Sequence, residues 1–252
     1  MGALHPGHIS LIHTALEQAD IVVCSVFVNP TQFTDPNDLA RYPRPVAHDV
    51  AMLTEAGCDA VFMPSVQEMY PTWPQPEPWQ IDLGPAEFLL EGAFRKGHYQ
   101  GVTQIVKKLF DAVEPDIALF GQKDYQQVLM IRNMVDRLHL SVEIISCPII
   151  RESDGLAMSS RNVHLSADDR QHAKVLSRAL QYIKDHSQTR NVVELLENAG
   201  KIITDTPDVQ LDYLTVANRE TLQPVLAGSA SGTIALVAAT VGTTRLIDNM
   251  LI

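Results

Sequence analysis

Two histidines stand three residues apart at the start of a predicted helix, in the segment Met1-Gly2-Ala3-Leu4-His5-Pro6-Gly7-His8. This spacing can turn the imidazoles of His5 and His8 toward one side, and Gly7 lets a ligand approach the backbone closely. Unpaired N–H groups and the dipole at a helix N-terminus favour an anion. A phosphate site is predicted here. The alternatives are two surface histidines, or two zinc ligands for which no Cys/His cluster supplies the rest.

Two further polar segments have the composition of phosphate-binding loops. Gly121-Gln122-Lys123-Asp124 follows a predicted strand, at the edge where α/β sheets bind ligands, and Lys123 offers a point charge to a phosphate. Asp124 could accept from a ribose hydroxyl or only cap the next helix. Residues 155–162 include Ser159, Ser160 and Arg161, a donor set suited to polyphosphate, although an ordinary polar linker between domains has the same composition.

A fourth segment, Phe27-Val28-Asn29-Pro30-Thr31-Gln32-Phe33, also follows a predicted strand. Its amides beside an aromatic ring suit a small hydroxylated substrate, with Asn29 alternatively a turn residue. Of Gln126 and Gln127, which follow the Lys123 segment, we expect one to face inward.

Amphipathic helical patterns alternate with apolar runs through the first part of the chain. The helical patterns cover residues 8–19, 45–56, 102–113 and 124–138, and the apolar runs cover 21–28, 60–63, 116–120 and 142–145. This order predicts a parallel α/β sheet with helices on both faces and right-handed crossovers. The first helix begins so close to Met1 that no strand precedes it. We therefore expect either that an N-terminal segment is missing from the sequence or that the sheet lacks a strand that is normally central.

The second part of the chain has a different pattern. The proline-rich residues 64–85 predict a long irregular excursion or lid before it. After residue 150, Ser166 and Asn191 mark two helix starts, and strands are predicted over 209–216 and 233–241. This order favours a smaller α+β domain with antiparallel pairing, beginning near residues 149–150.

Composition limits the kinds of partner. With 19 Lys and Arg against 30 Asp and Glu, the net charge of −11 argues against a nucleic-acid or anionic-membrane binder. The 3 cysteines suggest neither a disulfide framework nor a metal site, so a reducing compartment is expected. The apolar run at 21–28 is far shorter than the ~20 residues of a membrane helix, and the N-terminus does not look like a signal peptide. A soluble, cytoplasmic protein is the expectation.

Taken together, MGALHPGH, FVNPTQF, ARYPR, GAFRKGHYQGV, FGQKDYQQ and GLAMSSRN resemble, in order and spacing, the pantoate–β-alanine ligase family of the HIGH-motif nucleotidylyltransferase superfamily. The resemblance runs through most of the chain. It implies a Rossmann-like domain over residues 1–149, with its first strand missing here, and a smaller α+β domain over 150–252 that carries the MSSR loop. It also implies a homodimer and the reaction ATP + pantoate + β-alanine → pantothenate + AMP + pyrophosphate.

The resemblance also assigns roles to residues. His8 is the implied proton donor, and His5, Lys123, Ser159, Ser160 and Arg161 are expected to act with it on the phosphates. Pantoate is assigned to Gln32 and Gln127, with Gln32 also close to β-alanine and Asn29 beside it, and Asp49 is expected to help hold Mg²⁺. The implied ATP site comprises Met1, Gly2, Ala3, Leu4, His5, Pro6, Gly7, His8, Gly121, Gln122, Lys123, Asp124, Ile150, Met158, Ser159, Ser160 and Arg161. Pro6 and Gln122 stand where the family more often has acidic residues, and neither position has to supply a charge to phosphate.

The expected chemistry needs no protein nucleophile. The carboxylate of pantoate attacks the α-phosphorus and expels pyrophosphate, and the amine of β-alanine then attacks the acyl adenylate and releases AMP. Two alternatives are another HIGH-type nucleotidylyltransferase, which would release a nucleotide-containing product, and a non-catalytic nucleotide sensor. A tRNA-charging enzyme is disfavoured because the chain has no basic stripe.

Overall fold

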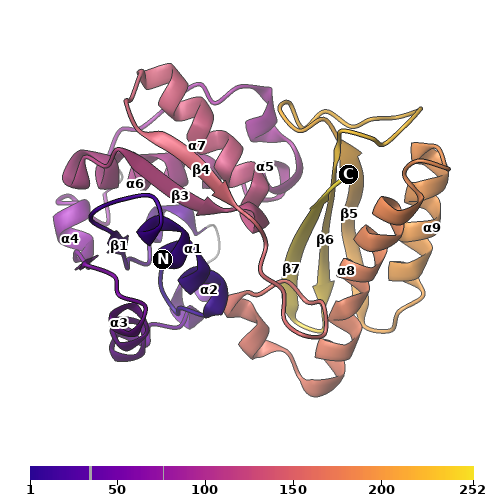
Figure 1. Ribbon diagram of the computed structural model, residues 1–252, viewed down its shortest axis with the longest axis horizontal. Helices are drawn as coiled ribbons and strands as arrows, with labels where there is room; N and C mark the ends of the chain where they lie inside the picture. Colours follow the sequence, from indigo (N-terminus) through magenta and orange to yellow (C-terminus); the bar gives the residue numbers. More distant parts are fainter. Residues whose placement is uncertain (34–35, 76) are drawn as a thin grey trace. The chain divides into compact units, whose positions relative to one another are not determined.

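The structure is a computed structural model that describes residues 1–33, 36–75 and 77–252 (Figure 1). The chain forms two compact units, one of residues 1–122 and 126–148, the other of residues 123–125 and 149–252. The short segment 123–125 thus packs with the second unit, although it lies within the first in sequence. The domain boundary at residues 149–150 stays a prediction. The two compact units differ from it in placing residues 123–125 with the second unit.

Two parallel strand pairs, flanked by helices, form the first unit. β1 (Val23–Ser25) pairs with β2 (Ala60–Phe62), and β3 (Ile117–Gly121) pairs with β4 (Glu143–Cys147). Helices α3 (Val46–Glu55) and α7 (Tyr125–Leu138) lie between the paired strands in sequence, as parallel pairing requires. The predicted α/β class is confirmed. The pattern predicted one sheet, however, whereas the strands form two separate two-stranded sheets.

The longer of the remaining helices in the first unit are α1 (Pro6–Leu16) and α6 (His98–Val113). The short ones are α2 (Pro36–Arg41), α4 (Val66–Met69) and α5 (Leu90–Phe94), with the 3₁₀ helices η1 (Pro30–Gln32), η2 (Pro85–Phe88) and η3 (Gln122–Asp124). Helix α1 starts with proline at its first position, where the missing N–H costs nothing. The predicted excursion at 64–85 is largely irregular, with α4 inside it.

The second unit is an antiparallel sheet covered by two helices (Figure 1). Helices α8 (Ala167–His186) and α9 (Val192–Thr204) pack on strands β5 (Val209–Ala217), β6 (Ile234–Val241) and β7 (Thr244–Leu251), with the 3₁₀ helix η4 (Ser160–His164) before them. Ser166 and Asn191 cap the two helices, as their positions predict. Strand β7 was not predicted.

The three cysteines are free thiols, and burial raises the pKa of Cys24 to about 11. Among the residues that the structure describes, no helix has the length and apolar character needed to span a bilayer.

Gly101 offers a test of how α6 supports η1. A Cβ at this position would lie 2.5 Å from the backbone oxygen of Thr31, so Gly101→Ala must push η1 away. We expect a loss of ~1–3 kcal/mol in the free energy of unfolding, the usual cost of overpacking. In Gly200→Ala, the added Cβ meets nothing within 4 Å, so that control should gain roughly 0.5–1 kcal/mol. Urea unfolding measures both, and equal stability of the two variants would contradict the packing described.

Candidate active site

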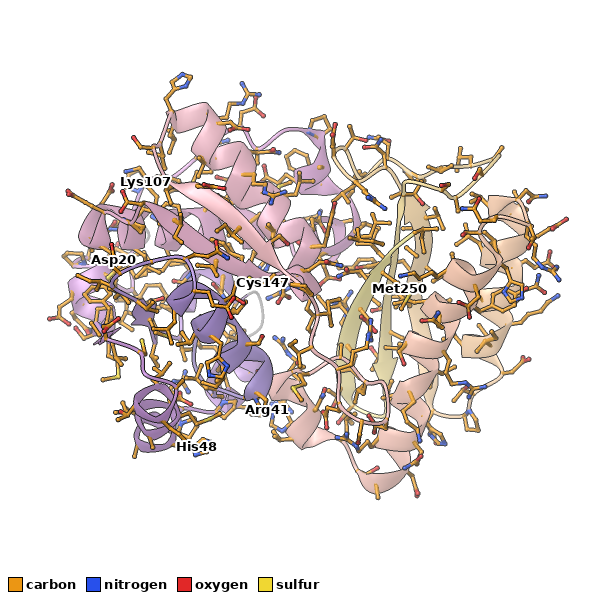
Figure 2. All side chains as sticks on the ribbon, in the orientation of Figure 1. Asp20, Arg41, His48, Lys107, Cys147 and Met250 are labelled. Carbon is orange, nitrogen blue, oxygen red and sulfur yellow. The ribbon has the colours of Figure 1, made fainter. Side chains whose placement is uncertain are left out.

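The loop that leads into α1 is anchored by Asp49. This carboxylate is 1% exposed and accepts the backbone N–H groups of Ala3 at 2.9 Å and Leu4 at 2.7 Å. Ala3 has a φ of 50°, which a non-glycine residue adopts only when its surroundings hold it there. Asp49 lies on α3, where Figure 2 labels its neighbour His48. The predicted phosphate loop is thus fastened to a neighbouring helix before α1 begins.

The two histidines lie together, as their spacing predicts. His5 is the N-cap of α1, and the ring centroids of His5 and His8 are 3.9 Å apart. Nδ1 of His8 accepts the backbone N–H of His5 at 3.3 Å. Because Nδ1 is the acceptor, a neutral His8 carries its proton on Nε2. The helix start therefore combines a hydrogen-bond donor with the positive end of the helix dipole, which is the arrangement an anion needs.

The segment around Gln32 starts beside this loop. The backbone N–H of Phe27 donates to the oxygen of Met1 at 2.9 Å, so the chain leaves β2 and the predicted strand over 21–28 is shorter than expected. The next turn, η1, places Gln32 at its end. Two of the predicted substrate-binding segments are therefore neighbours in the first unit.

Asn29 serves the protein interior. It is 3% exposed, and its Oδ1 accepts from the hydroxyls of Tyr70 at 2.8 Å and Thr31 at 3.1 Å. Its amide nitrogen donates to the backbone oxygen of Gly101 at 3.1 Å and to Oε1 of Gln32 at 3.2 Å. These contacts use the whole amide, so they favour the turn-residue alternative over the expectation that Asn29 binds substrate directly. Asn29 orients Gln32.

The GAFRKGHYQGV segment contributes to the family resemblance, but the sequence alone predicted no role for its residues. His98 Nδ1 donates to the backbone oxygen of Gln32 at 2.8 Å, and Arg95 reaches the same oxygen at 3.4 Å. Gly101 lets the backbone of Thr31 pack directly on α6. The segment therefore holds η1 in place. Its signal in the sequence is an arginine, a histidine and a glycine on one stretch, which gives no indication of what these residues contact.

The glutamine pair on α7 divides as expected. Gln126 is 3% exposed, donates to the backbone oxygens of Ala86 and Leu89, both at 2.8 Å, and accepts from the N–H of Glu91 at 3.1 Å. It ties α7 to η2 and α5. Gln127 is half-buried on the same helix. One glutamine faces inward, as predicted, and the role of Gln127 toward pantoate stays a prediction.

The second unit carries the other predicted phosphate residues. Lys123 and Ser159 line one small cavity. Its other lining residues are Leu156, Ala157, Asn162, Leu176, Leu246, Ile247 and Asp248. Segments that lie far apart in the sequence thus meet within this unit. If Lys123 and Ser159 bind the same phosphates, as predicted, they have to lie close together in this way.

The loop before η4 is ordered by its own contacts. Met158 N–H donates to the oxygen of Ile150 at 3.0 Å, and Ser159 Oγ accepts from the N–H of Arg161 at 3.2 Å. Asn162 donates to Glu152 at 2.9 Å, and Arg170 on α8 pairs with that carboxylate. An ordinary polar linker between domains would not need such a network. The contacts therefore favour the other alternative, a loop that presents hydrogen-bond donors to polyphosphate.

The observed contacts of Asp49 are structural. Each of its carboxylate oxygens accepts one backbone N–H, from Ala3 and Leu4, and the side chain is buried. Within residues 1–33, 36–75 and 77–252, no group of three or more His, Cys, Asp and Glu side chains could hold a metal ion. The predicted role of Asp49 toward Mg²⁺ stays a prediction, beside its observed role as an anchor of the loop.

The structure brings the predicted residues together in two groups. His5, His8, Gln32 and Gln127 belong to the first unit, and Lys123, Ser159, Ser160 and Arg161 belong to the second. A single triphosphate site made of both groups stays a prediction.

A parallel α/β unit with an anion-binding helix start is the fold of many nucleotide-binding enzymes. The family model for pantoate-beta-alanine ligase matches residues 1–251, and the chain belongs to that family. The predicted activity, ATP-dependent ligation of pantoate with β-alanine, is thereby confirmed.

Curated relatives and solved structures agree with this membership. Pantothenate synthetase of Bacteroides thetaiotaomicron is 45% identical over 251 residues, covering 99% of this chain and 88% of the relative. A crystal structure of pantothenate synthetase from Thermus thermophilus has a TM-score of 0.94 at 44% identity, covering 99% of this chain and 90% of that one. The ligase of Francisella tularensis, complexed with beta-gamma ATP and β-alanine, has a TM-score of 0.77 at 34% identity, covering 100% and 87%.

The role of Asp49 can be tested by Asp49→Asn. The amide would set an N–H donor against a backbone N–H of Ala3 or Leu4, which should cost ~1–3 kcal/mol of stability. Urea unfolding in EDTA without nucleotide measures it, with the exposed Asp136→Asn on α7 as control. Unchanged stability together with a lost magnesium requirement would contradict the structural role and support the predicted metal role.

Proposed function

We propose that this ligase activates pantoate as an acyl adenylate on the His5–His8 helix start. The carboxylate of pantoate attacks the α-phosphorus of ATP, and the bond to pyrophosphate breaks. The amine of β-alanine then attacks the acyl carbon, loses a proton, and AMP leaves as the amide forms. The observation that carries the proposal is the hydrogen bond from the His5 N–H to His8 Nδ1, which leaves Nε2–H of a neutral His8 as the donor.

The difficulty of the first step is that two anions have to meet. His8 as hydrogen-bond donor, with His5 beside it, stabilises the charge that develops on the phosphates, at the positive end of α1. We assign Lys123, Ser159, Ser160 and Arg161 to the same phosphates, because Lys123 and Ser159 line one cavity. The remaining predicted contacts of ATP are with residues 1–8, 121–124, 150 and 158–161, and ATP is proposed to bind as its magnesium complex.

Pantoate is assigned to Gln32 and Gln127. Gln32 is suited to this role because its side chain is oriented by Asn29 and its backbone oxygen by His98. A substrate-binding side chain held in this way loses little freedom when the substrate arrives. Asn29 acts through Gln32 in this proposal, which amends its predicted direct contact with substrate.

The Francisella tularensis ligase supports the choice of ligands, since it was solved with beta-gamma ATP and β-alanine. We further propose, from the family resemblance, that the enzyme is a cytoplasmic homodimer. The direct test of the function is AMP release measured with ATP, pantoate and β-alanine, each omitted in turn. AMP release that needs all three supports the ligase. Nucleotide binding without it would indicate a sensor, and a released nucleotide conjugate would indicate the nucleotidylyltransferase alternative.

For His8 we expect a kinetic effect with little change in folding. His8→Ala should lower pantoate-dependent pyrophosphate release by roughly 10²–10³-fold, the loss that follows removal of one placed donor. His13→Ala is the matched control, because His13 lies exposed on the same helix. Near-normal pyrophosphate release by the His8 variant would remove this residue from the mechanism.

For the glutamines we expect a split between ligands. Gln32→Ala and Gln127→Ala should each raise the Kd of pantoate by about tenfold, the value of one hydrogen bond of ~1–1.5 kcal/mol. The Kd of ATP should change far less. Calorimetric titration measures both ligands, and Gln18→Ala, at an exposed position, is the control. An unchanged pantoate Kd in either variant would refute the assignment of that glutamine.

A further inference from the structure

Two buried polar residues stand next to each other on β7, and the first of them lines the cavity that Lys123 lines. Asp248 is 4% exposed and Asn249 is 2% exposed, which is unusual for such residues in a strand. Met250, labelled in Figure 2, marks the end of the strand that carries them. Neither residue was predicted to act, so their burial requires a reason.

Asn249 fixes the backbone of Lys123. Its Nδ2 donates to the oxygen of Lys123 at 2.9 Å. Two residues on, the hydroxyl of Tyr125 donates to the backbone oxygen of Arg219 at 2.9 Å. The segment 123–125 is therefore tied to the second unit at two points, and the start of the Lys123 side chain has a fixed position.

Asp248 is neutralised by Arg151 in a two-pronged contact. Nη1 of Arg151 lies 2.7 Å from Oδ2, and Nη2 lies 3.0 Å from Oδ1. The guanidinium also donates to the backbone oxygens of Gly155 at 3.1 Å and Asn249 at 3.3 Å. Both carboxylate oxygens are thus occupied by one cation. Burial raises the pKa of Asp248, while Arg151 and Lys123 act in the opposite direction.

The charges around this cavity decide whether the ammonium of Lys123 is available to an anion. Lys123 and Asp248 both line it, and a buried carboxylate attracts any nearby ammonium strongly. With Arg151 in place, two cations face one carboxylate, and one positive charge remains for an anion. Without Arg151, Lys123 and Asp248 would neutralise each other, and the ammonium of Lys123 would no longer attract a phosphate.

We propose that Arg151 is a positioning residue that occupies Asp248 and so keeps the ammonium of Lys123 available to the phosphates of ATP, while Asn249 fixes the backbone of Lys123. The inference rests on the proposed function, in which Lys123 meets phosphate. Arg151 touches neither substrate nor product in this account and acts only through Asp248 and Lys123.

The two partners of the ion pair should respond differently to substitution. Arg151→Met leaves Asp248 to capture Lys123, so the Kd of ATP should rise at least tenfold. Asp248→Asn removes the competing charge, so ATP should bind as tightly as in the wild type or more tightly. The double variant, Arg151→Met with Asp248→Asn, should bind ATP within about threefold of the wild type. Equilibrium titration of the whole protein with ATP measures each Kd, and thermal melting reports folding.

A purely structural role predicts another pattern. If the pair only stabilises the fold, both single variants should weaken ATP binding alike, and the double variant should not recover, which would overturn the proposal. If Arg151→Met does not fold, Asp248→Asn and the double variant still test the proposal by comparison with the wild type. Weaker ATP binding in both of these variants would contradict the proposal. Arg245→Met is the matched control. Arg245 lies on β7, the strand of Asp248, but it pairs with Asp212 on β5 at 2.7 Å and does not line the cavity. Its ATP Kd should be unchanged.

Failure of the inference can be distinguished from failure of the proposed function. Lys123→Met should itself weaken ATP binding, and Arg151→Met should then have no further effect in the Lys123→Met background. If Lys123→Met leaves the ATP Kd unchanged, the assignment of Lys123 to phosphate fails. If Lys123→Met weakens binding but Arg151→Met does not, only the role of Arg151 fails.

Discussion

Repulsion between two anionic substrates is the constraint on which this enzyme depends. A carboxylate has to approach a triphosphate in a protein whose own net charge is −11. Positive potential must therefore be local, supplied by a helix start and a few cations. The acidic residues close to the candidate site are handled accordingly: backbone amides take up the charge of Asp49, and Arg151 takes up that of Asp248.

The side chains that we propose to contact substrate are held in position by other residues, which do not contact substrate themselves. Gln32 is oriented through Asn29 at its side chain and His98 at its backbone. Lys123 is held through Asn249. Each arrangement moves the loss of conformational freedom from substrate binding to folding, which is how a short reactive loop reaches the precision that catalysis needs.

The sequence was informative wherever the deciding contacts are local. Helix starts at Ser166 and Asn191, the histidine pair and the order of strands and helices follow from neighbours a few residues apart. Strand β7 was missed because Asp248 and Asn249 interrupt its apolar pattern. The contacts that satisfy these buried side chains come from Arg151, 97 residues from Asp248, and from Lys123, 126 residues from Asn249. The interior role of Asn29 depends likewise on Tyr70 and Gly101, which no spacing in the sequence connects to it.

Transfer of an oxygen atom tests the central claim, that the carboxylate of pantoate becomes bonded to the α-phosphorus in an acyl adenylate. Pantoate labelled with ¹⁸O in its carboxyl group should be converted with ATP and β-alanine, and the products analysed by mass spectrometry. The account predicts one ¹⁸O atom in AMP, because the oxygen that attacks phosphorus leaves with it when the amide forms. Recovery of the label in pyrophosphate or inorganic phosphate, or unlabelled AMP, would contradict it.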